Sequence, residues 1–237
     1  MCRLFGMSGG TNAVQATFWL IDAPTSFILQ SVEQPDGVGL GTFNADGDPV
    51  IYRKPVPAHR SQTYISSAQD VRSRTFLSHI RHATAGGPTF ENTHPFEQKG
   101  RIFGHNGVIG DLPRLRELLG PYAELVLGST DSELYFTLIT KCIDEAEGDI
   151  GVGIGAAARQ IAAAVPLYSL NMILTTETDL WALRYPDTNE LWILEHSIGG
   201  YDTGGFDERG LSGTFRVASA ALSVVPATVI ASEPMDA

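Results

Sequence analysis

The spacing of apolar and polar residues predicts short β-strands through the first half of the chain. Side-chain character alternates most clearly over Arg74 to Thr84, which is typical of a strand that runs into a loop. Four further strands are expected at residues 1–10, 36–43, 50–54 and 100–108. In the second of these, Gly37, Gly39 and Gly41 indicate that another backbone passes close by.

The middle of the chain changes to helical periodicity. Apolar residues of the segment 131–147 recur at intervals of three and four, which places them on one face of a helix. Before this segment, Asp111 can cap a helix that has Pro113 in its first turn and ends at Gly120. The alanine-rich segment 155–165 predicts a third helix.

Strand-like segments return in the last third of the chain and complete the fold prediction. The expected strands, joined as a meander, are residues 170–176, 180–185, 191–196 and 214–220. A glycine-rich stretch, residues 197–213, is either a plain connection or a lid. Strands, then helices, then strands predict a layered α+β fold in which helices cover two antiparallel sheets.

Composition is that of an ordinary globular protein. The chain has 237 residues, 43% of them hydrophobic and 18% charged, and we expect one domain over residues 1–237. The net charge is −11 and the lysines and arginines form no cluster, which argues against a nucleic-acid partner.

Neither a membrane span nor a signal peptide is expected. The best apolar stretch, residues 150–170, is broken by Arg159 and Pro166. In residues 1–30, polar and proline positions interrupt the apolar segment that a signal peptide needs. With two cysteines and no CxxC pair, reduced thiols fit a cytoplasmic protein.

Cys2 is the most informative single residue, because it follows Met1 directly. Removal of the methionine would leave a thiol and a free α-amine on one residue. An α-amine titrates near about 7.7–8.0, so the two groups can act as nucleophile and base, as in N-terminal threonine hydrolases. The alternative is that Cys2 is a small apolar residue that opens a strand. Cys142, on the apolar helix face, is expected in the core.

Four segments follow Cys2 in order. They read His-Ile-Arg-His-Ala-Thr at 79–84, Asn-Thr-His-Pro-Phe at 92–96, His-Asn-Gly at 105–107 and Ser-Thr-Asp-Ser-Glu at 129–133. Together with Cys2 they resemble the glutaminase domain of class II glutamine amidotransferases, which belong to the N-terminal-nucleophile (Ntn) hydrolases. The resemblance implies the Ntn-hydrolase fold, a four-layer αββα sandwich.

The resemblance also implies the roles of the reacting groups. The Cys2 thiolate would attack the carboxamide carbon of glutamine, and its own α-amine would carry the proton to the departing ammonia. The Asn106 side chain and the Gly107 backbone N–H would form the oxyanion hole. Without the other segments, Asn106 and Gly107 would be expected in a hairpin turn.

Three further residues are expected to bind the substrate. Arg81 offers a bidentate fork for the α-carboxylate, and Thr84 adds a hydroxyl donor. Asp131 would pair with the α-ammonium. Taken alone, Arg81 would be a surface cation and Asp131 a helix N-cap, and Asp131 can be both cap and ligand.

No metal or cofactor is expected. Histidines occur at 79, 82, 94 and 105, but without the spacing of a metal site. His79 and His82 would point to opposite faces of a strand, and His94 is expected to shape the loop under the site. The glycines at 151, 153 and 155 imitate half a dinucleotide fingerprint, but no convincing strand precedes them.

The sequence departs from the family in ways that leave the reaction open. No ammonia-using domain follows, so the chain resembles the small stand-alone members, and a synthetase or other acceptor would be a separate partner protein. Val38 stands where several relatives have tryptophan, and we expect that the C-terminus at 232–237 is truncated. The alternatives are a γ-glutamyl-amide hydrolase that releases a biosynthetic amine and a silent glutamine-binding regulatory module.

Overall fold

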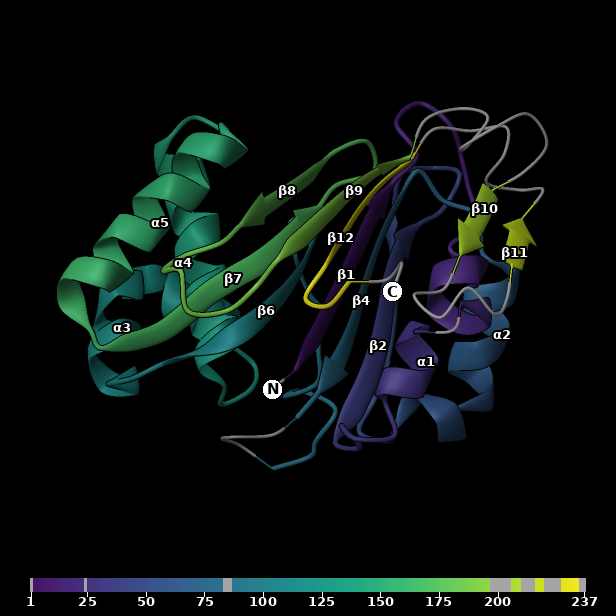
Figure 1. The fold of residues 1–237 in the computed structure, drawn as a ribbon. Helices are drawn as coiled ribbons and strands as arrows, with labels where there is room; N and C mark the ends of the chain where they lie inside the picture. Colours follow the sequence, from purple (N-terminus) through teal and green to yellow (C-terminus); the bar gives the residue numbers. More distant parts are fainter. Residues whose placement is uncertain are drawn as a thin grey trace.

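The chain is built in four layers. The computed structural model describes residues 2–23, 25–82, 87–196, 206–209, 216–219 and 227–234. Two antiparallel sheets lie in the middle and helices cover both outer faces (Figure 1). The αββα arrangement predicted from the sequence is therefore confirmed.

The larger sheet has six strands in the order β3-β2-β4-β1-β12-β9, and every neighbouring pair is antiparallel. Its strands are β1 (Arg3–Ser8), β2 (Gly37–Phe43), β3 (Pro49–Lys54), β4 (Thr75–Arg81), β9 (Trp192–His196) and β12 (Ala227–Ala231). The first strand of the chain thus lies inside the sheet, between β4 and a strand from the far end of the sequence.

The smaller sheet has four strands in the order β5-β6-β7-β8. They are β5 (Phe96–Gln98), β6 (Arg101–Ile109), β7 (Leu167–Thr175) and β8 (Leu180–Leu183). A separate antiparallel pair consists of β10 (Phe206–Arg209) and β11 (Arg216–Ser219).

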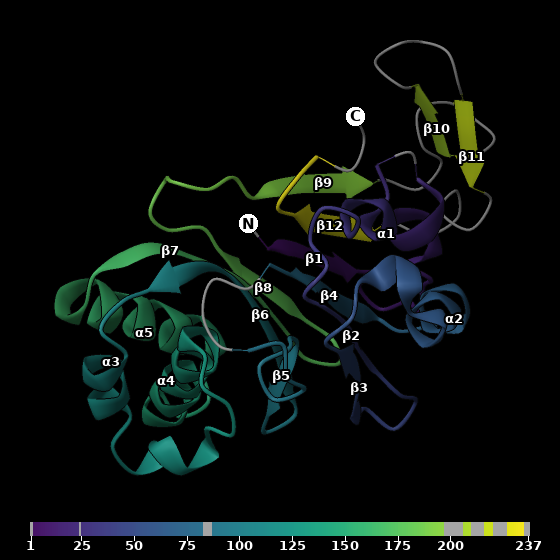
Figure 2. The same cartoon turned by 90° about the horizontal axis from the view of Figure 1, so that it is seen from below.

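Two groups of helices cover the outer faces of the sheets (Figure 2). Beside the six-stranded sheet lie η1 (Phe18–Asp22), α1 (Phe27–Gln30), η2 (Ala58–Arg60) and α2 (Gln62–Asp70). Beside the four-stranded sheet lie α3 (Leu112–Leu119), η3 (Gly120–Leu125), α4 (Asp131–Glu145) and α5 (Ile150–Ala164). In the described ranges, no helix is long and apolar enough to cross a membrane.

Apolar side chains fill the space between the layers. In β1, Leu4 packs between the two sheets and Phe5 packs under the α1 and α2 layer, because successive side chains of a strand point to opposite faces. The buried side chains that share the space between the sheets with Leu4 are Phe43, Leu77, Ile102, Ile173 and Ile230. All residues of β2 and β4 are buried because both faces of these strands are covered.

The glycines of β2 allow the close backbone approach that the sequence predicted. A Cβ atom on Gly39 would lie 2.1 Å from the carbonyl oxygen of His94, and one on Gly41 would lie 2.6 Å from Ile102 Cγ2. The chain segment that carries His94 therefore rests directly on the strand, beneath the candidate site.

Replacing Gly39 by alanine is expected to destabilise the fold by about 3 kcal/mol or more, because the new methyl group meets a backbone oxygen that cannot move freely. Gly151→Ala is the matched control, because a Cβ there meets its nearest atom only at 3.6 Å, in an exposed helical turn. Urea unfolding of both variants measures the difference. Equal stability of the two variants would contradict the close contact.

The predicted helices are confirmed. The Asp111 side chain accepts the N–H of Arg114 at the start of α3, and Gly120 ends that helix with a φ of 55°. Helix α5 begins five residues before the expected start, so the glycines at 151–155 lie inside it. A Cβ on Gly153 would lie 2.7 Å from the Ile143 backbone nitrogen, so this glycine lets α5 pack directly against α4.

The predicted meander at the C-terminal end is wrong in its second half. β7 and β8 are adjacent, but β9 joins the other sheet next to β12. The expected strand at 214–220 is β11, which pairs with β10 inside the predicted glycine-rich stretch; residues 197–205 and 210–213 of that stretch lie outside the described residues. The sequence analysis also missed β5, β12, α1 and α2.

Candidate functional site

Cys2 lies at the beginning of β1, where the two sheets face each other. Its Sγ accepts the backbone N–H of His82 at 3.3 Å, and its S–H donates to the carbonyl of the same residue at 3.4 Å. Burial raises the pKa of the Cys2 thiol, and the hydrogen bond from His82 opposes that shift. A thiol held neutral in this way needs a base to become a nucleophile.

A small cavity of about 50 Å³ opens at Cys2. Its lining residues are Cys2, His82, Asn106, Gly107, Val108, Tyr168 and Asn189. Cys2 comes from the six-stranded sheet, whereas Asn106 and Gly107 come from β6 of the other sheet. The structure therefore brings together three residues that the sequence assigned to the reacting centre.

Asn106 and Gly107 lie within β6, opposite Asn171 and Leu170 of β7. The alternative of a hairpin turn is therefore wrong. The Asn106 side chain donates to Ser232 Oγ at 3.3 Å, and the same oxygen accepts the Leu4 N–H at 2.9 Å. Ser232 thus ties Asn106 to β1, next to Cys2, and the sequence gave no sign of this contact.

Gly107 occupies a position that excludes any side chain. A Cβ atom there would lie 1.9 Å from the carbonyl oxygen of Ser169 and 2.6 Å from His105 Nε2. The reason for glycine here is the close approach of β7.

Arg81 ends β4 and is not a surface cation, because only 4% of it is exposed. Its Nη1 donates to the carbonyl of Gly87 at 3.0 Å. Thr84, the expected second ligand of the α-carboxylate, lies outside the described residues.

Asp131 is the first residue of α4, and the helix N-cap is Thr130. The interpretation of Asp131 as the cap is therefore wrong by one residue. One carboxylate oxygen accepts the Ile109 N–H at 2.8 Å and the other accepts the Ser132 N–H at 2.9 Å, so the carboxylate joins α4 to the end of β6. The charges of Arg81 and Asp131 both act on the Cys2 thiol, in opposite directions.

Two buried polar residues, to which the sequence analysis gave no role in the site, hold the loops around it. The Asn92 side chain donates to the Gly87 carbonyl at 3.3 Å and accepts the Ser129 N–H at 2.9 Å. The Glu133 carboxylate accepts the N–H groups of Leu127 and Gly128 at 2.9 and 2.6 Å. The Thr-x-x-Glu spacing at 130–133 was the available signal, although here Glu133 reaches the preceding loop and not the N-cap.

Three buried histidines lie behind the site. His79 Nε2 donates to the His105 carbonyl at 3.1 Å, and its ring stacks on His94 with 4.0 Å between centroids. His105 Nε2 donates to the Ser169 carbonyl at 3.0 Å, so its Nδ1 accepts from Ser132 Oγ at 2.9 Å. Burial lowers the pKa of His79 to about 3, and it also lowers the pKa of His94 and of His105. All three rings are therefore neutral near pH 7.

No cluster of three or more potential metal ligands occurs among the described histidines, cysteines and carboxylates. His82, the remaining histidine of the first segment, is exposed.

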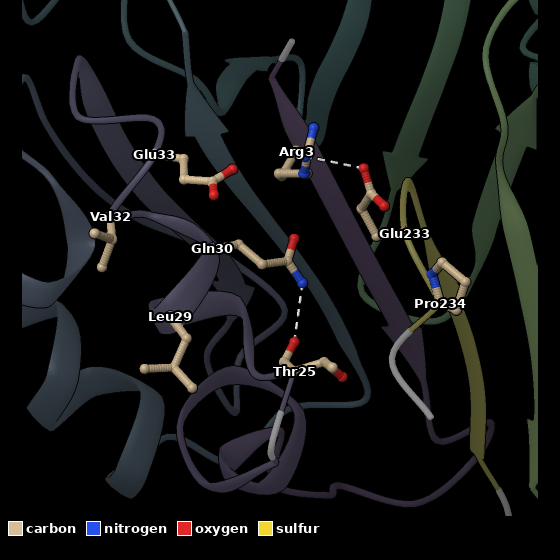
Figure 3. A pocket seen from close by; sticks show the side chains of 8 residues that line it. All are labelled: Arg3, Thr25, Leu29, Gln30, Val32, Glu33, Glu233 and Pro234. Atoms are coloured by element: carbon tan, nitrogen blue, oxygen red, sulfur yellow. Dashed lines mark hydrogen bonds and ion pairs between the residues drawn. The ribbon is translucent and has the colours of Figure 1, made fainter. Parts of the chain in front are cut away.

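A larger cavity, of about 440 Å³, lies between the start of β1, the α1 region and residues 233–234 (Figure 3). Two pairs of its polar groups interact: Arg3 with Glu233 at 3.0 Å, and Gln30 Nε2 with the Thr25 carbonyl at 2.9 Å. Cys2 does not line it. The smaller cavity is therefore the candidate active site.

Comparison with known sequences identifies the family. The profile described as "Glutamine amidotransferases class-II" matches residues 1–199. The chain is 31% identical over 211 residues to the gamma-glutamyl-hercynylcysteine sulfoxide hydrolase of Mycobacterium tuberculosis, covering 84% of this chain and 82% of that protein. It is 29% identical over 166 residues to the probable glutamine amidotransferase DUG3 of Saccharomyces cerevisiae, covering 61% of this chain. The match spans only 46% of the yeast protein, and 34% of an archaeal relative, MJ1515 of Methanocaldococcus jannaschii.

Solved structures share the fold. The glutamine aminotransferase class-II domain protein from Silicibacter pomeroyi superposes with a TM-score of 0.59 at 21% identity, over 97% of this chain and 88% of that one. The glutamine phosphoribosylpyrophosphate amidotransferase of B. subtilis superposes with a TM-score of 0.61 at 17% identity, over 98% of this chain and 42% of that one. By sequence, the chain belongs to the class II glutamine amidotransferase family, and its four layers are the Ntn-hydrolase fold.

Proposed function

We propose that the protein is an amidohydrolase that cleaves the γ-carboxamide of glutamine through a γ-glutamyl thioester on Cys2, giving glutamate and ammonia. The observation that carries the proposal is the cavity shared by Cys2, Asn106 and Gly107. These groups supply a nucleophile and two oxyanion donors from two different sheets. In this proposal, residues 1–237 form one glutaminase-type domain.

The proposed reaction uses only groups of this chain. After loss of Met1, the α-amine of Cys2 accepts the thiol proton, and the thiolate attacks the carboxamide carbon. The Asn106 side chain has two N–H donors and uses one on Ser232, so the other is free for the oxyanion beside the Gly107 N–H. Collapse breaks the C–N bond, and the ammonium of Cys2 gives its proton to the departing ammonia. Water then hydrolyses the thioester to glutamate.

Substrate recognition would fall to Arg81, Thr84 and Asp131. The Arg81 guanidinium is planar and suits the α-carboxylate of glutamine. The Asp131 oxygens already accept one backbone N–H each, and a carboxylate oxygen has capacity for a second donor, here the α-ammonium.

Replacing Asp131 by asparagine is expected to reduce kcat/KM for glutamine about 10- to 100-fold, because a charged hydrogen bond to the α-ammonium is lost. The matched measurement uses a substrate without the α-ammonium, the monoamide of glutaric acid. The wild-type chain should prefer glutamine strongly, and Asp131→Asn should lose most of that preference. An equal loss on both substrates would remove Asp131 from ammonium binding.

A γ-glutamyl-amide hydrolase that releases a biosynthetic amine is the second candidate. The similarity to the M. tuberculosis hydrolase, over most of both chains, favours it. A third candidate, a silent glutamine-binding regulatory module, keeps Arg81 and Asp131 but forms no thioester. If ammonia is released, a synthetase or another acceptor protein would use it.

The test compares initial rates of a chain processed to begin at Cys2. Glutamine and γ-glutamyl amides of larger amines are supplied in parallel, and released glutamate is measured. Faster turnover of glutamine supports the main proposal, whereas much faster turnover of the larger amides supports the second candidate. Glutamine binding without turnover of any of these compounds would leave the regulatory module.

A further inference from the structure

Asn189 is a buried residue in an otherwise exposed connection between β8 and β9. Only 4% of it is exposed, whereas its neighbours Asp187, Thr188 and Glu190 are exposed. It lines the same small cavity as Cys2. Asn189 lies in none of the four sequence segments described above, and the proposed reaction gives it no role.

The backbone of Asn189 is held firmly in place. Its carbonyl accepts Asn171 Nδ2 at 3.1 Å and Arg184 Nε at 2.8 Å. Asn171 lies on β7 directly opposite Asn106, and its side-chain oxygen accepts the Tyr185 N–H at 3.1 Å. The residue beside Asn106 in the sheet therefore also fixes the position of Asn189.

The side chain of Asn189, in contrast, has unsatisfied hydrogen-bonding groups. Its Nδ2 and Oδ1 are both buried, and neither has a hydrogen-bond partner within the part of the chain that the structure describes. Burying an amide in this way is unfavourable, and nearly all buried amides in proteins are paired. A leucine of similar size would fill the same space without this cost. The presence of an asparagine at this position therefore points to a polar partner inside the cavity.

We propose that Asn189 is a substrate-contacting residue whose Oδ1 accepts the N–H of the scissile amide; this rests on the proposed function. A carboxamide presents an oxygen on one side and an N–H on the other. The cavity presents two buried amide side chains, Asn106 and Asn189. With Asn106 assigned to the oxygen, Asn189 is the buried amide that remains for the nitrogen.

This contact would select amides over esters. By holding both ends of the carboxamide, Asn106 and Asn189 would turn its carbon toward Cys2 Sγ, which is an orientation effect on thioester formation. An ester has no N–H and gains nothing from Asn189. The connection between β8 and β9 would therefore determine which leaving groups the site accepts.

The test is Asn189→Leu, assayed with glutamine and with the γ-methyl ester of glutamate. Because kcat/KM reports the steps up to thioester formation, it should fall about 10- to 100-fold for glutamine and change less than about threefold for the ester. Thermal stability should stay the same or rise, because an unpaired buried amide is removed. Glu190→Gln, an exposed change in the same connection whose side chain bonds the Trp192 indole N–H, should leave both rates unchanged.

Two results would overturn the inference alone. Equal losses on amide and ester would make Asn189 a structural residue, and no loss on either would place it away from the substrate. If the wild-type chain, processed to begin at Cys2, hydrolyses neither compound, the proposed function fails and this inference fails with it. The wild-type rates therefore distinguish a failure of the inference about Asn189 from a failure of the proposed function.

Discussion

Replacing Cys2 by alanine is expected to lower hydrolysis of glutamine by at least about 10⁴-fold while glutamine still binds. The variant removes the sulfur on which the proposed thioester forms. The described hydrogen bonds of Arg81 and Asp131, the groups assigned to the α-carboxylate and the α-ammonium, are made to groups other than the sulfur. Catalysis and binding should therefore separate in this variant.

The measurement combines rates with covalent labelling. A diazoketone analogue of glutamine should add once to the wild-type chain, at Cys2, and the intact mass before labelling shows whether Met1 has been removed. Cys142→Ala is the matched control, because this second thiol is buried on α4 and accepts a hydrogen bond from Gln160. It should label and turn over like the wild type.

Other outcomes would change the assignment. A Cys2→Ala chain that still hydrolyses glutamine at a comparable rate would exclude the thioester. A processed wild-type chain that binds glutamine but takes no label would point to the regulatory module.

Acid is expected to destabilise the protein strongly between about pH 6.5 and pH 5, because the fold keeps buried histidines neutral. Burial lowers the pKa of His79 to about 3 from an ordinary value of 6.5, and the pKa values of His94 and His105 move in the same direction. At a pH above this ordinary pKa the rings are neutral in both the folded and the unfolded state, so they do not change the free energy of unfolding. Below it the unfolded chain binds protons that the folded chain does not, so stability falls as the pH falls.

The size of the effect follows from proton counting. Each histidine that stays neutral in the folded chain removes about 1.4 kcal/mol of unfolding free energy per pH unit below its ordinary pKa. His79 and His94 together therefore remove about 3 kcal/mol per unit, and His105 shifts stability in the same direction. By about pH 5 the loss from His79 and His94 is about 4 kcal/mol, which is a large part of the whole stability of many domains. Urea unfolding between about pH 8 and pH 5 measures this slope.

The variant His94→Phe tests whether the buried histidines cause the loss of stability in acid. The ring nitrogens of His94 are buried without a hydrogen-bond partner among the described residues, and the ring contacts His79 and Phe96, so phenylalanine keeps an aromatic ring there. The slope should fall by about 1.4 kcal/mol per pH unit. The difference in stability at about pH 8 reports packing alone, because the rings are neutral there in both states. An unchanged slope would show that other groups control acid unfolding.

Sequence patterns predicted most of the fold because local signals were consistent with it. The caps at Asp111 and Gly120 and the apolar face of α4 act within one helix, and the glycines of β2 require a close neighbour whichever it is. Strand order depends on contacts between distant segments, and this is where the prediction failed. Nothing near residues 191–196 indicates that β9 leaves β8 and joins the other sheet.

In the candidate site, too, local signals were predictive and contacts between distant segments were not. The segments around Arg81, Asn106 and Asp131 predicted its charged and polar groups. A hairpin turn at Asn106 was the local alternative, and pairing with β7 overrides that turn propensity. Ser232 and Asn189 could not be predicted, because their importance comes from contacts with residues far away in the sequence.

The position of β1 between β4 and β12 has a consequence for biosynthesis. The Leu4 N–H donates to Ser232 Oγ, across 228 positions of sequence, and β1 pairs with residues 228–231. While the chain is being made, the first strand therefore lacks one neighbour until nearly all of the described sequence has left the ribosome. If Met1 is removed, as the proposed reaction requires, the enzyme that removes it has this interval in which to reach the residues around Cys2, before β12 completes the sheet.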